Sequence, residues 1–172
     1  MANILKISEI IRPFKKKITI EGDKSISIRW ALLASQATGR SKSYNLLKSE
    51  DVINTLNCLK KLGVKIRLRQ DTCEIFGVGL NGFRYKKNIK LDAGNSGTLG
   101  RLILGLLVHS KNKIFIKGDK SLSKRDFLRV TKPLEKFGAK FNSNFGKLPI
   151  KIQGTNYSKP IRFYENKGSA QC

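Results

Sequence analysis

Two short polar turns carry residue types that suit the binding of an anion. Gly22-Asp-Lys-Ser and Gly94-Asn-Ser-Gly-Thr each connect an expected strand to an expected helix. A helix start exposes free N–H groups and about half a positive charge, and glycine lets a ligand approach the backbone closely. The first turn also offers the ammonium group of Lys24 and the hydroxyl group of Ser25. Both turns are therefore candidate sites for a phosphate or a carboxylate.

Arginine residues accompany both turns. Arg29 and Arg101 lie inside the two helices, among apolar neighbours. A third polar turn, Gly118-Asp-Lys-Ser-Leu-Ser-Lys-Arg, ends on Arg125, whose guanidinium group can bind an anion through two parallel hydrogen bonds. The alternative is ordinary helix capping beside solvated arginines. Because two matched turns occur in one chain, both interpretations, anion binding and ordinary capping, stay open.

Other kinds of chemistry find little support in the sequence. No turn is a GxxxxGK(S/T) phosphate loop or a GxGxxG dinucleotide turn, so no nucleotide cofactor is expected. Cys58, Cys73 and Cys172 form no CxxC pair and His109 is the single histidine, so we expect no metal site and no disulfide framework. Reduced thiols indicate a cytoplasmic location. The most apolar run, 102–108, is far too short to span a membrane.

The chain is strongly basic. Its 172 residues include 35 Lys and Arg against 12 Asp and Glu, which gives a formal charge of +23. Such a charge predicts anionic partners and makes a basic nucleic-acid-binding module the rival hypothesis. Three features argue against this rival: no nucleic-acid motif is present, lysine outnumbers arginine, and the aromatic residues, at 8%, do not alternate with the basic runs.

An internal repeat organises the elements that must position these turns. Leu59-Lys-Lys-Leu-Gly-Val-Lys-Ile is matched 75 residues later by Leu134-Glu-Lys-Phe-Gly-Ala-Lys-Phe, and Ser25 corresponds to Ser96. A drifting offset indicates copies of one supersecondary unit with small loop insertions. Apolar periodicity and turn residues predict helices over 26–36, 50–62, 99–108 and 125–137, and strands over 17–21, 43–47, 64–68, 73–78, 89–92, 113–117, 140–145 and 149–153.

This order of elements predicts an α/β (α+β) fold of repeated β-α-β-α-β-β units. The expected divisions are an N-terminal segment 1–17, a first unit 18–88, a second unit 89–157 and the start of a third unit 158–172. The third unit stops just as its helix starts, which favours a fragment over a frayed tail of a complete two-unit protein. Ser25 or Ser27 is the expected N-cap of the first helix and Ser49 that of the second, which Gly63 ends.

In their order and spacing, the polar motifs resemble those of the family of 5-enolpyruvylshikimate-3-phosphate (EPSP) synthases, the 3-phosphoshikimate 1-carboxyvinyltransferases. The similarity runs from about residue 18 to the last residue. The sibling family that acts on UDP-N-acetylglucosamine shares the fold but lacks this pairing of turns. The motifs that carry the resemblance are Gly22-Asp-Lys-Ser-Ile-Ser-Ile-Arg, Asn45-Leu-Leu-Lys-Ser-Glu-Asp-Val, Gly94-Asn-Ser-Gly-Thr, Gly118-Asp-Lys-Ser-Leu-Ser-Lys-Arg and Ser169-Ala-Gln.

The resemblance implies a fold of two domains, each made of three such units, of which this chain would hold the N-terminal part. It implies transfer of the enolpyruvyl group of phosphoenolpyruvate to the 5-hydroxyl group of shikimate 3-phosphate, with release of phosphate. This is a step of the shikimate pathway towards chorismate and the aromatic amino acids. The family reaction passes through a tetrahedral intermediate and needs no metal and no organic cofactor.

The resemblance also implies roles for individual residues. The shikimate 3-phosphate site would comprise Lys24, Ser25, Arg29, Ser169, Ala170 and Gln171. The phosphoenolpyruvate site would comprise Lys24, Asn95, Gly97, Arg101, Arg125 and Gln171. The family's acid–base residues belong to the second half of its fold, so no catalytic residue is expected here. We therefore expect no turnover from this chain alone, and whether a second polypeptide supplies the other half stays open.

Four residues depart from the family's usual pattern. Ile28 stands where the family has His or Asn, and Trp30 stands where a small Ala is usual. Cys172 stands at an apolar position. Asp126 replaces a usual Pro and would either weaken anion binding by neutralising Arg125 or cap the helix that follows.

Overall fold

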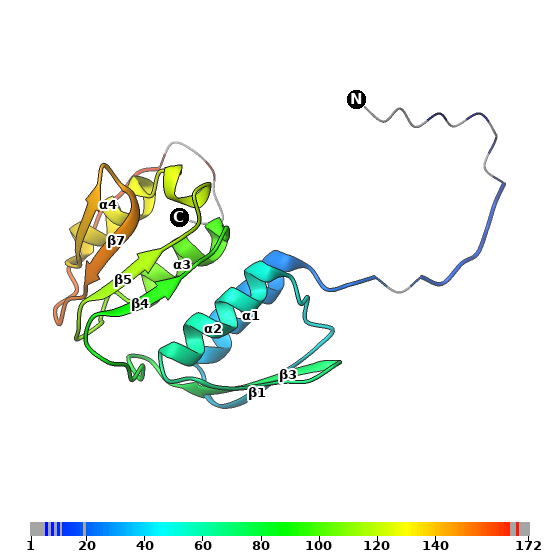
Figure 1. The fold of residues 1–172 in the computed structure, drawn as a ribbon, viewed down its shortest axis with the longest axis horizontal. Helices are drawn as coiled ribbons and strands as arrows, with labels where there is room; N and C mark the ends of the chain where they lie inside the picture. The colour runs from blue at the N-terminus through cyan, green and yellow to red at the C-terminus, as the bar shows by residue number, and fades with distance from the viewer. Residues whose placement is uncertain are drawn as a thin grey trace.

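The computed structural model describes residues 6, 8, 10, 12–18, 20–165 and 168 (Figure 1). Within them the helices are α1 (Lys24–Gln36), α2 (Glu50–Lys61), α3 (Gly97–Leu106) and α4 (Leu128–Phe137), with a 3-10 turn, η1 (Leu122–Lys124). The strands are β1 (Thr38–Tyr44), β2 (Lys65–Leu68), β3 (Thr72–Val78), β4 (Ile89–Asp92), β5 (Ile114–Lys117), β6 (Lys140–Asn144) and β7 (Lys147–Gln153). The predicted α/β class is thereby confirmed.

The first sheet has the strand order β1-β3-β2, and both strand pairs are antiparallel. Cys73 and Ile75 of β3 are fully buried, because alternate side chains of a strand point to the same face. Helices α1 and α2 cover that face (Figure 1).

The second sheet has the strand order β4-β5-β7-β6. Strands β4 and β5 are parallel, and the other two pairs are antiparallel. The carboxyl ends of β4 and β5 therefore meet at one edge of the sheet. The turn that leads to α3 starts at this edge, and so does the turn that leads to η1.

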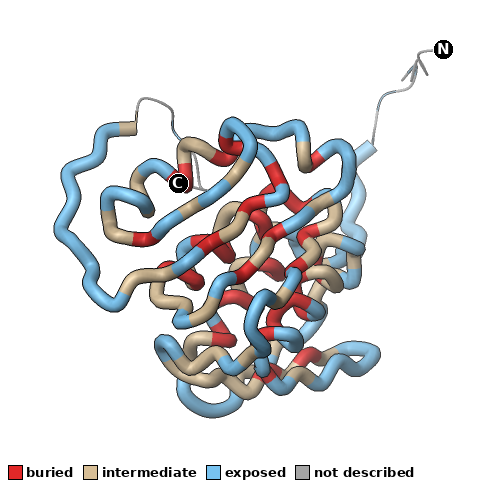
Figure 2. Tube along the Cα trace, turned by 60° about the vertical axis from the view of Figure 1, so that its left-hand side comes forward, coloured by how far each residue is buried: buried red, intermediate tan, exposed pale blue. Residues whose placement is uncertain are grey.

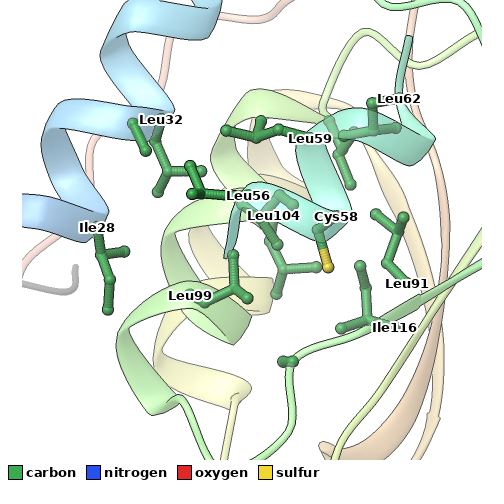
Figure 3. Packing of buried hydrophobic residues seen from close by; sticks show 14 of the residues in the cluster. Ile28, Leu32, Leu56, Cys58, Leu59, Leu62, Leu91, Leu99, Leu104 and Ile116 are labelled. Atoms are coloured by element: carbon green, nitrogen blue, oxygen red, sulfur yellow. The ribbon is translucent and has the colours of Figure 1, made fainter. Parts of the chain in front are cut away.

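One apolar core joins the two sheets and the helices between them. Buried residues lie along the inner turns of the chain, and exposed ones form its outer loops (Figure 2). Ile28 and Leu32 of α1, Leu56 and Leu59 of α2 and Leu99 of α3 belong to one cluster of buried side chains (Figure 3). Each such side chain contributes roughly 1.5–3 kcal/mol relative to an exposed position. The helix starts are therefore held by a shared core.

Two predicted strands are wrong. Residues 17, 18, 20 and 21 form no strand, whereas β4, which precedes α3, pairs with β5. Ile18 and Ile20 are 70% and 72% exposed. The alternation of apolar and polar residues predicted a strand here, but among the described residues this segment pairs with no neighbouring strand. The strand predicted at 43–47 is β1, which begins at Thr38 and ends before Asn45, whose φ of +52° breaks the extended backbone.

The predicted helix over 125–137 is also wrong in its first turn. Arg125 has an extended backbone with φ −76° and ψ 149°, and α4 begins only at Leu128. Phe127 is fully buried, and its N–H donates to the carbonyl oxygen of Gly146 in the β6–β7 turn at 2.9 Å. This long-range contact replaces the helical hydrogen bonds that the sequence pattern predicted.

The first helix has a different N-cap from the one predicted. Asp23 rather than Ser25 or Ser27 is the N-cap, and its Oδ1 accepts from the Ile26 N–H at 2.7 Å. The buried Ser27 hydroxyl instead accepts from the N–H of Leu47 at 3.2 Å. In α2 the N-cap position is occupied by Ser49, as predicted, but without a side-chain capping bond.

Candidate anion-binding site

The turn that precedes α3 is held by short polar contacts. The buried Ser96 caps the helix, since its Oγ accepts from the Leu99 N–H at 3.2 Å. The Gly94 N–H donates to Oδ1 of Asp92 at 3.0 Å, and Oδ2 of Asp92 lies 2.7 Å from Nζ of Lys117. The lysine contact is the main cause that holds the pKa of Asp92 below its ordinary value. The start of α3 is thus fixed by neighbouring strand ends.

Two guanidinium groups converge on Gly97, the first residue of α3. A Cβ atom placed on Gly97 would lie 3.0 Å from Nη1 of Arg101 and 3.1 Å from Nη1 of Arg125. Arg101 also lies 5.0 Å over the ring of Phe127 and donates to the carbonyl oxygen of Asp126 at 3.1 Å. A side chain at this position would press on both guanidinium groups, which would have to shift by a few tenths of an ångström. Together they give the helix start a strong positive charge.

Asn95 and Asp119 connect the second predicted turn to the third. Nδ2 of Asn95 donates to Oδ2 of Asp119 at 2.6 Å, and Nη2 of Arg125 donates to Oδ1 of Asn95 at 3.4 Å. The backbones meet as well, since the N–H of Asp119 donates to the carbonyl oxygen of Gly94 at 2.8 Å. Asn95, Gly97, Arg101 and Arg125 therefore share one site.

Lys24 reaches this region through α2. Its Nζ lies 3.1 Å from Oδ2 of Asp51, and the lysine side chain is 51% exposed. In the same turns of α2, the Asn54 side chain occupies the space where a Cβ atom on Gly94 would lie. Helix α2 therefore lies between the Lys24 side chain of α1 and the turn that precedes α3.

The other predicted substrate residues are less closely connected. Ser25 and Arg29 lie half-buried on α1, and no bond from either to the α3 site occurs among the described residues. Ser169, Ala170 and Gln171 lie outside the described residues.

Sequence reasoning assigned no role to Asp119. Gly-Asp-Lys-Ser occurs twice, and in both copies the aspartate accepts from the N–H three residues later: Asp23 from Ile26 at 2.7 Å and Asp119 from Leu122 at 2.6 Å. The repeated Gly-Asp-Lys-Ser motif could therefore have predicted this bond for both aspartates. The contact of Asp119 with Asn95 was not predictable, because it depends on the pairing of β4 with β5.

Other reactive residue types lie away from this site. Burial raises the pKa values of Cys58 and Cys73 to about 11, so their thiols are poor nucleophiles at neutral pH. His109 packs edge-on against Phe137, with Nδ1 2.9 Å from the carbonyl oxygen of Thr155. No group of three potential metal ligands occurs among the described residues. No helix in the described part combines the length and apolarity that crossing a bilayer requires.

Comparison with known proteins places these motifs in one family. Residues 8–172 match the family model of EPSP synthase (3-phosphoshikimate 1-carboxyvinyltransferase). A 3-phosphoshikimate 1-carboxyvinyltransferase of Ruthia magnifica is 46% identical over 154 residues, which cover 90% of this chain and 35% of that protein. One from Streptococcus suis is 40% identical over 169 residues, covering 97% and 39%. A solved EPSP synthase of Acinetobacter baumannii superposes with a TM-score of 0.85 at 36% identity, covering 92% of this chain and 36% of that chain.

Proposed function

The chain belongs to the EPSP synthase family, and on that premise we propose that it supplies the N-terminal, substrate-binding part of a 3-phosphoshikimate 1-carboxyvinyltransferase. It spans little more than a third of the relatives that it matches, 35% and 39% of their lengths. The reaction moves the enolpyruvyl group of phosphoenolpyruvate to the 5-hydroxyl group of shikimate 3-phosphate and releases phosphate. We place this reaction in the cytoplasm.

The convergence of Arg101 and Arg125 on Gly97 is the observation that best supports this proposal. Phosphoenolpyruvate carries a phosphate and a carboxylate, and planar guanidinium groups bind both through paired hydrogen bonds. The backbone at a helix start adds N–H groups and a positive potential. In our proposal Arg125 holds phosphoenolpyruvate against α3, with Asn95 beside it.

The ammonium group of Lys24 would contact both substrates in this arrangement. Its ion pair with Asp51 restrains a flexible side chain and leaves half of its surface exposed. Ser25 and Arg29 of α1 would bind shikimate 3-phosphate, together with Ser169, Ala170 and Gln171. Binding of two polyanions gives the charge of +23 a purpose, and no comparison points to nucleic-acid binding.

The chemical step requires groups that the resemblance assigns to the second half of the family fold. General acid–base assistance contributes typically 10²–10⁴-fold to a rate, and closure of a second domain excludes water. We therefore propose that the 172-residue chain binds substrate but has no steady turnover alone. Phosphate release at an ordinary enzymatic rate from the purified chain would refute this.

A chimera tests the proposed function directly. Residues 8–172 of this chain would replace the matching N-terminal part of the Ruthia magnifica relative. We expect phosphate release from phosphoenolpyruvate that depends on shikimate 3-phosphate, and a raised KM for phosphoenolpyruvate when the chimera carries Arg125→Gln. A folded chimera that binds neither substrate would contradict the proposal.

A further inference from the structure

The carboxylate of Asp119 is fixed from two sides. Oδ1 accepts from the Leu122 N–H at 2.6 Å, and Oδ2 accepts from Nδ2 of Asn95 at 2.6 Å. These bonds, that of Leu122 first, hold the pKa of Asp119 below its ordinary value. Asp119 is therefore ionised at neutral pH.

This carboxylate decides which way the Asn95 amide faces. A side-chain amide presents an acceptor on one side and two donors on the other. With Nδ2 turned to Asp119, the acceptor Oδ1 faces Nη2 of Arg125 at 3.4 Å. The reverse orientation would turn the amide oxygen to a carboxylate and the amide hydrogens to a guanidinium group, and both contacts would be repulsive.

The amide also separates two opposite charges. Lys117 and Asp92 form a direct ion pair at 2.7 Å, which partly neutralises both groups. Among the described residues no carboxylate lies within 4.0 Å of Arg125. The negative charge that orients Arg125 acts through neutral Asn95, so the cation is held but remains available to an anion.

We propose that Asp119 is a positioning residue of the anion site: it fixes the Asn95 amide with Oδ1 towards Arg125, and Asn95 serves as a neutral spacer between the carboxylate and the guanidinium group. Only the identity of the bound anion depends on the proposed function. The simpler alternative is that Asp119 merely holds the start of η1 by accepting from the Leu122 N–H. The two interpretations predict opposite changes in anion affinity when the Asp119 charge is removed. If Asp119 has no positioning role, loss of a nearby negative charge should by itself strengthen anion binding.

The test compares Asp119→Asn with Asp126→Asn in the 172-residue chain. An asparagine at 119 can still accept from the Leu122 N–H, so the hydrogen bond at the start of η1 is retained. Asp126 is the matched control, because it adjoins Arg125 in the sequence and its Oδ1 caps Leu128 at 2.7 Å without contacting Asn95. Inorganic phosphate and phosphoenolpyruvate are the probes, and the carboxamide NMR signals of Asn95 are recorded without ligand.

Asp119→Asn is expected to shift the Asn95 carboxamide signals and to weaken phosphoenolpyruvate binding about three- to tenfold, the effect of one hydrogen bond. Asp126→Asn should leave those signals in place and bind as tightly as the wild type or more tightly. In the double variant Asn95→Asp/Asp119→Asn the hydrogen bonds can re-form at constant net charge, but a carboxylate then faces Arg125. We expect it to bind more weakly than Asp119→Asn.

Unchanged Asn95 signals in Asp119→Asn, or phosphate and phosphoenolpyruvate affinities equal to or above those of the wild type, would overturn the inference. A double variant that binds as well as the wild type would overturn the spacer role. If the wild type binds neither probe but the Asn95 signals respond to Asp119→Asn and not to Asp126→Asn, the proposed function fails while Asp119 is confirmed as the residue that positions Asn95.

Discussion

Gly97 shows how one residue type can determine a site. Its missing side chain leaves room for the guanidinium groups of Arg101 and Arg125 beside the first turn of α3. Gly105 lies on the same helix, but a Cβ atom there would contact nothing within 4 Å. Substitutions at these two glycines therefore distinguish an effect on the anion site from an effect on the stability of the helix.

Gly97→Ala should weaken phosphoenolpyruvate binding about three- to tenfold, because the new methyl group would push the guanidinium groups of Arg101 and Arg125 and strain their hydrogen bonds to the ligand. Calorimetric titration measures this loss. Gly105→Ala should leave binding unchanged and raise the free energy of unfolding by roughly 0.5–1 kcal/mol, since alanine stabilises a helix interior. Equal affinities for Gly97→Ala and the wild type would contradict the proposed geometry.

Residue types alone could predict much of this site, but not its contacts. Asn95, Gly97, Arg101 and Arg125 could be selected from polar turns beside predicted helices, and the structure brings them together. The role of Asp119 could not be predicted, because it results from two strand ends that lie side by side.

At the scale of elements, the segment between η1 and α4 determines where Arg125 lies. Asp126 directly follows Arg125, and the Oδ1 atom of Asp126 accepts from the Leu128 N–H at 2.7 Å. Of the two roles that the sequence left open for Asp126, the structure favours the one at the helix start. The Asp126 carboxylate bonds to the first N–H of α4 and forms no ion pair with Arg125 among the described residues, although the N-cap residue itself is Phe127. The backbone carbonyl of Asp126 also accepts from Arg101.

Asp126→Ala should lower the free energy of unfolding by about 1 kcal/mol, because it removes the hydrogen bond from the Leu128 N–H to the Asp126 carboxylate. Asp126→Asn should stay within a few tenths of a kcal/mol of the wild type, because an amide oxygen can accept the same bond. Urea denaturation of the three proteins provides the comparison. If alanine and asparagine destabilise the chain equally, this hydrogen bond is not what stabilises the start of α4.

Local sequence patterns predicted the order of the elements better than their ends. The helix over 50–62 was nearly correct, because Ser49 and Gly63 mark its limits locally, and Gly63 has a φ of +88°. The helix over 125–137 failed because Phe127 is drawn into the core and bonds to Gly146. A pattern within one segment contains no information on such distant partners.

At the scale of the whole molecule, the charge of +23 means that each ionised carboxylate reduces the repulsion among the positive charges. Asp92 and Asp119 both have pKa values below the ordinary value of 3.8, Asp92 chiefly because of Lys117 and Asp119 chiefly because of the Leu122 N–H. Because its pKa is lower in the folded state, each carboxylate makes its full contribution to the free energy of unfolding at pH values above its unfolded-state pKa. This contribution is lost as the pH falls through the folded-state pKa.

We therefore expect the free energy of unfolding to fall as the pH is lowered from about 5 through 3.8 and below. Asp92→Asn should be less stable than the wild type at neutral pH, and this difference should shrink as the solution becomes more acidic. Urea denaturation at a series of pH values measures both. A difference that is constant with pH would show that the ion pair with Lys117 does not contribute as described.

The most direct measurement is an NMR titration of the ¹⁵N-labelled chain with phosphoenolpyruvate in the presence of shikimate 3-phosphate. We predict that the largest shifts occur at the amides of Asn95 and Gly97 and at the side chain of Arg125, and that Arg125→Gln abolishes them. The absence of any shift, or the largest shifts on the β1-β3-β2 sheet with no effect of Arg125→Gln, would contradict it.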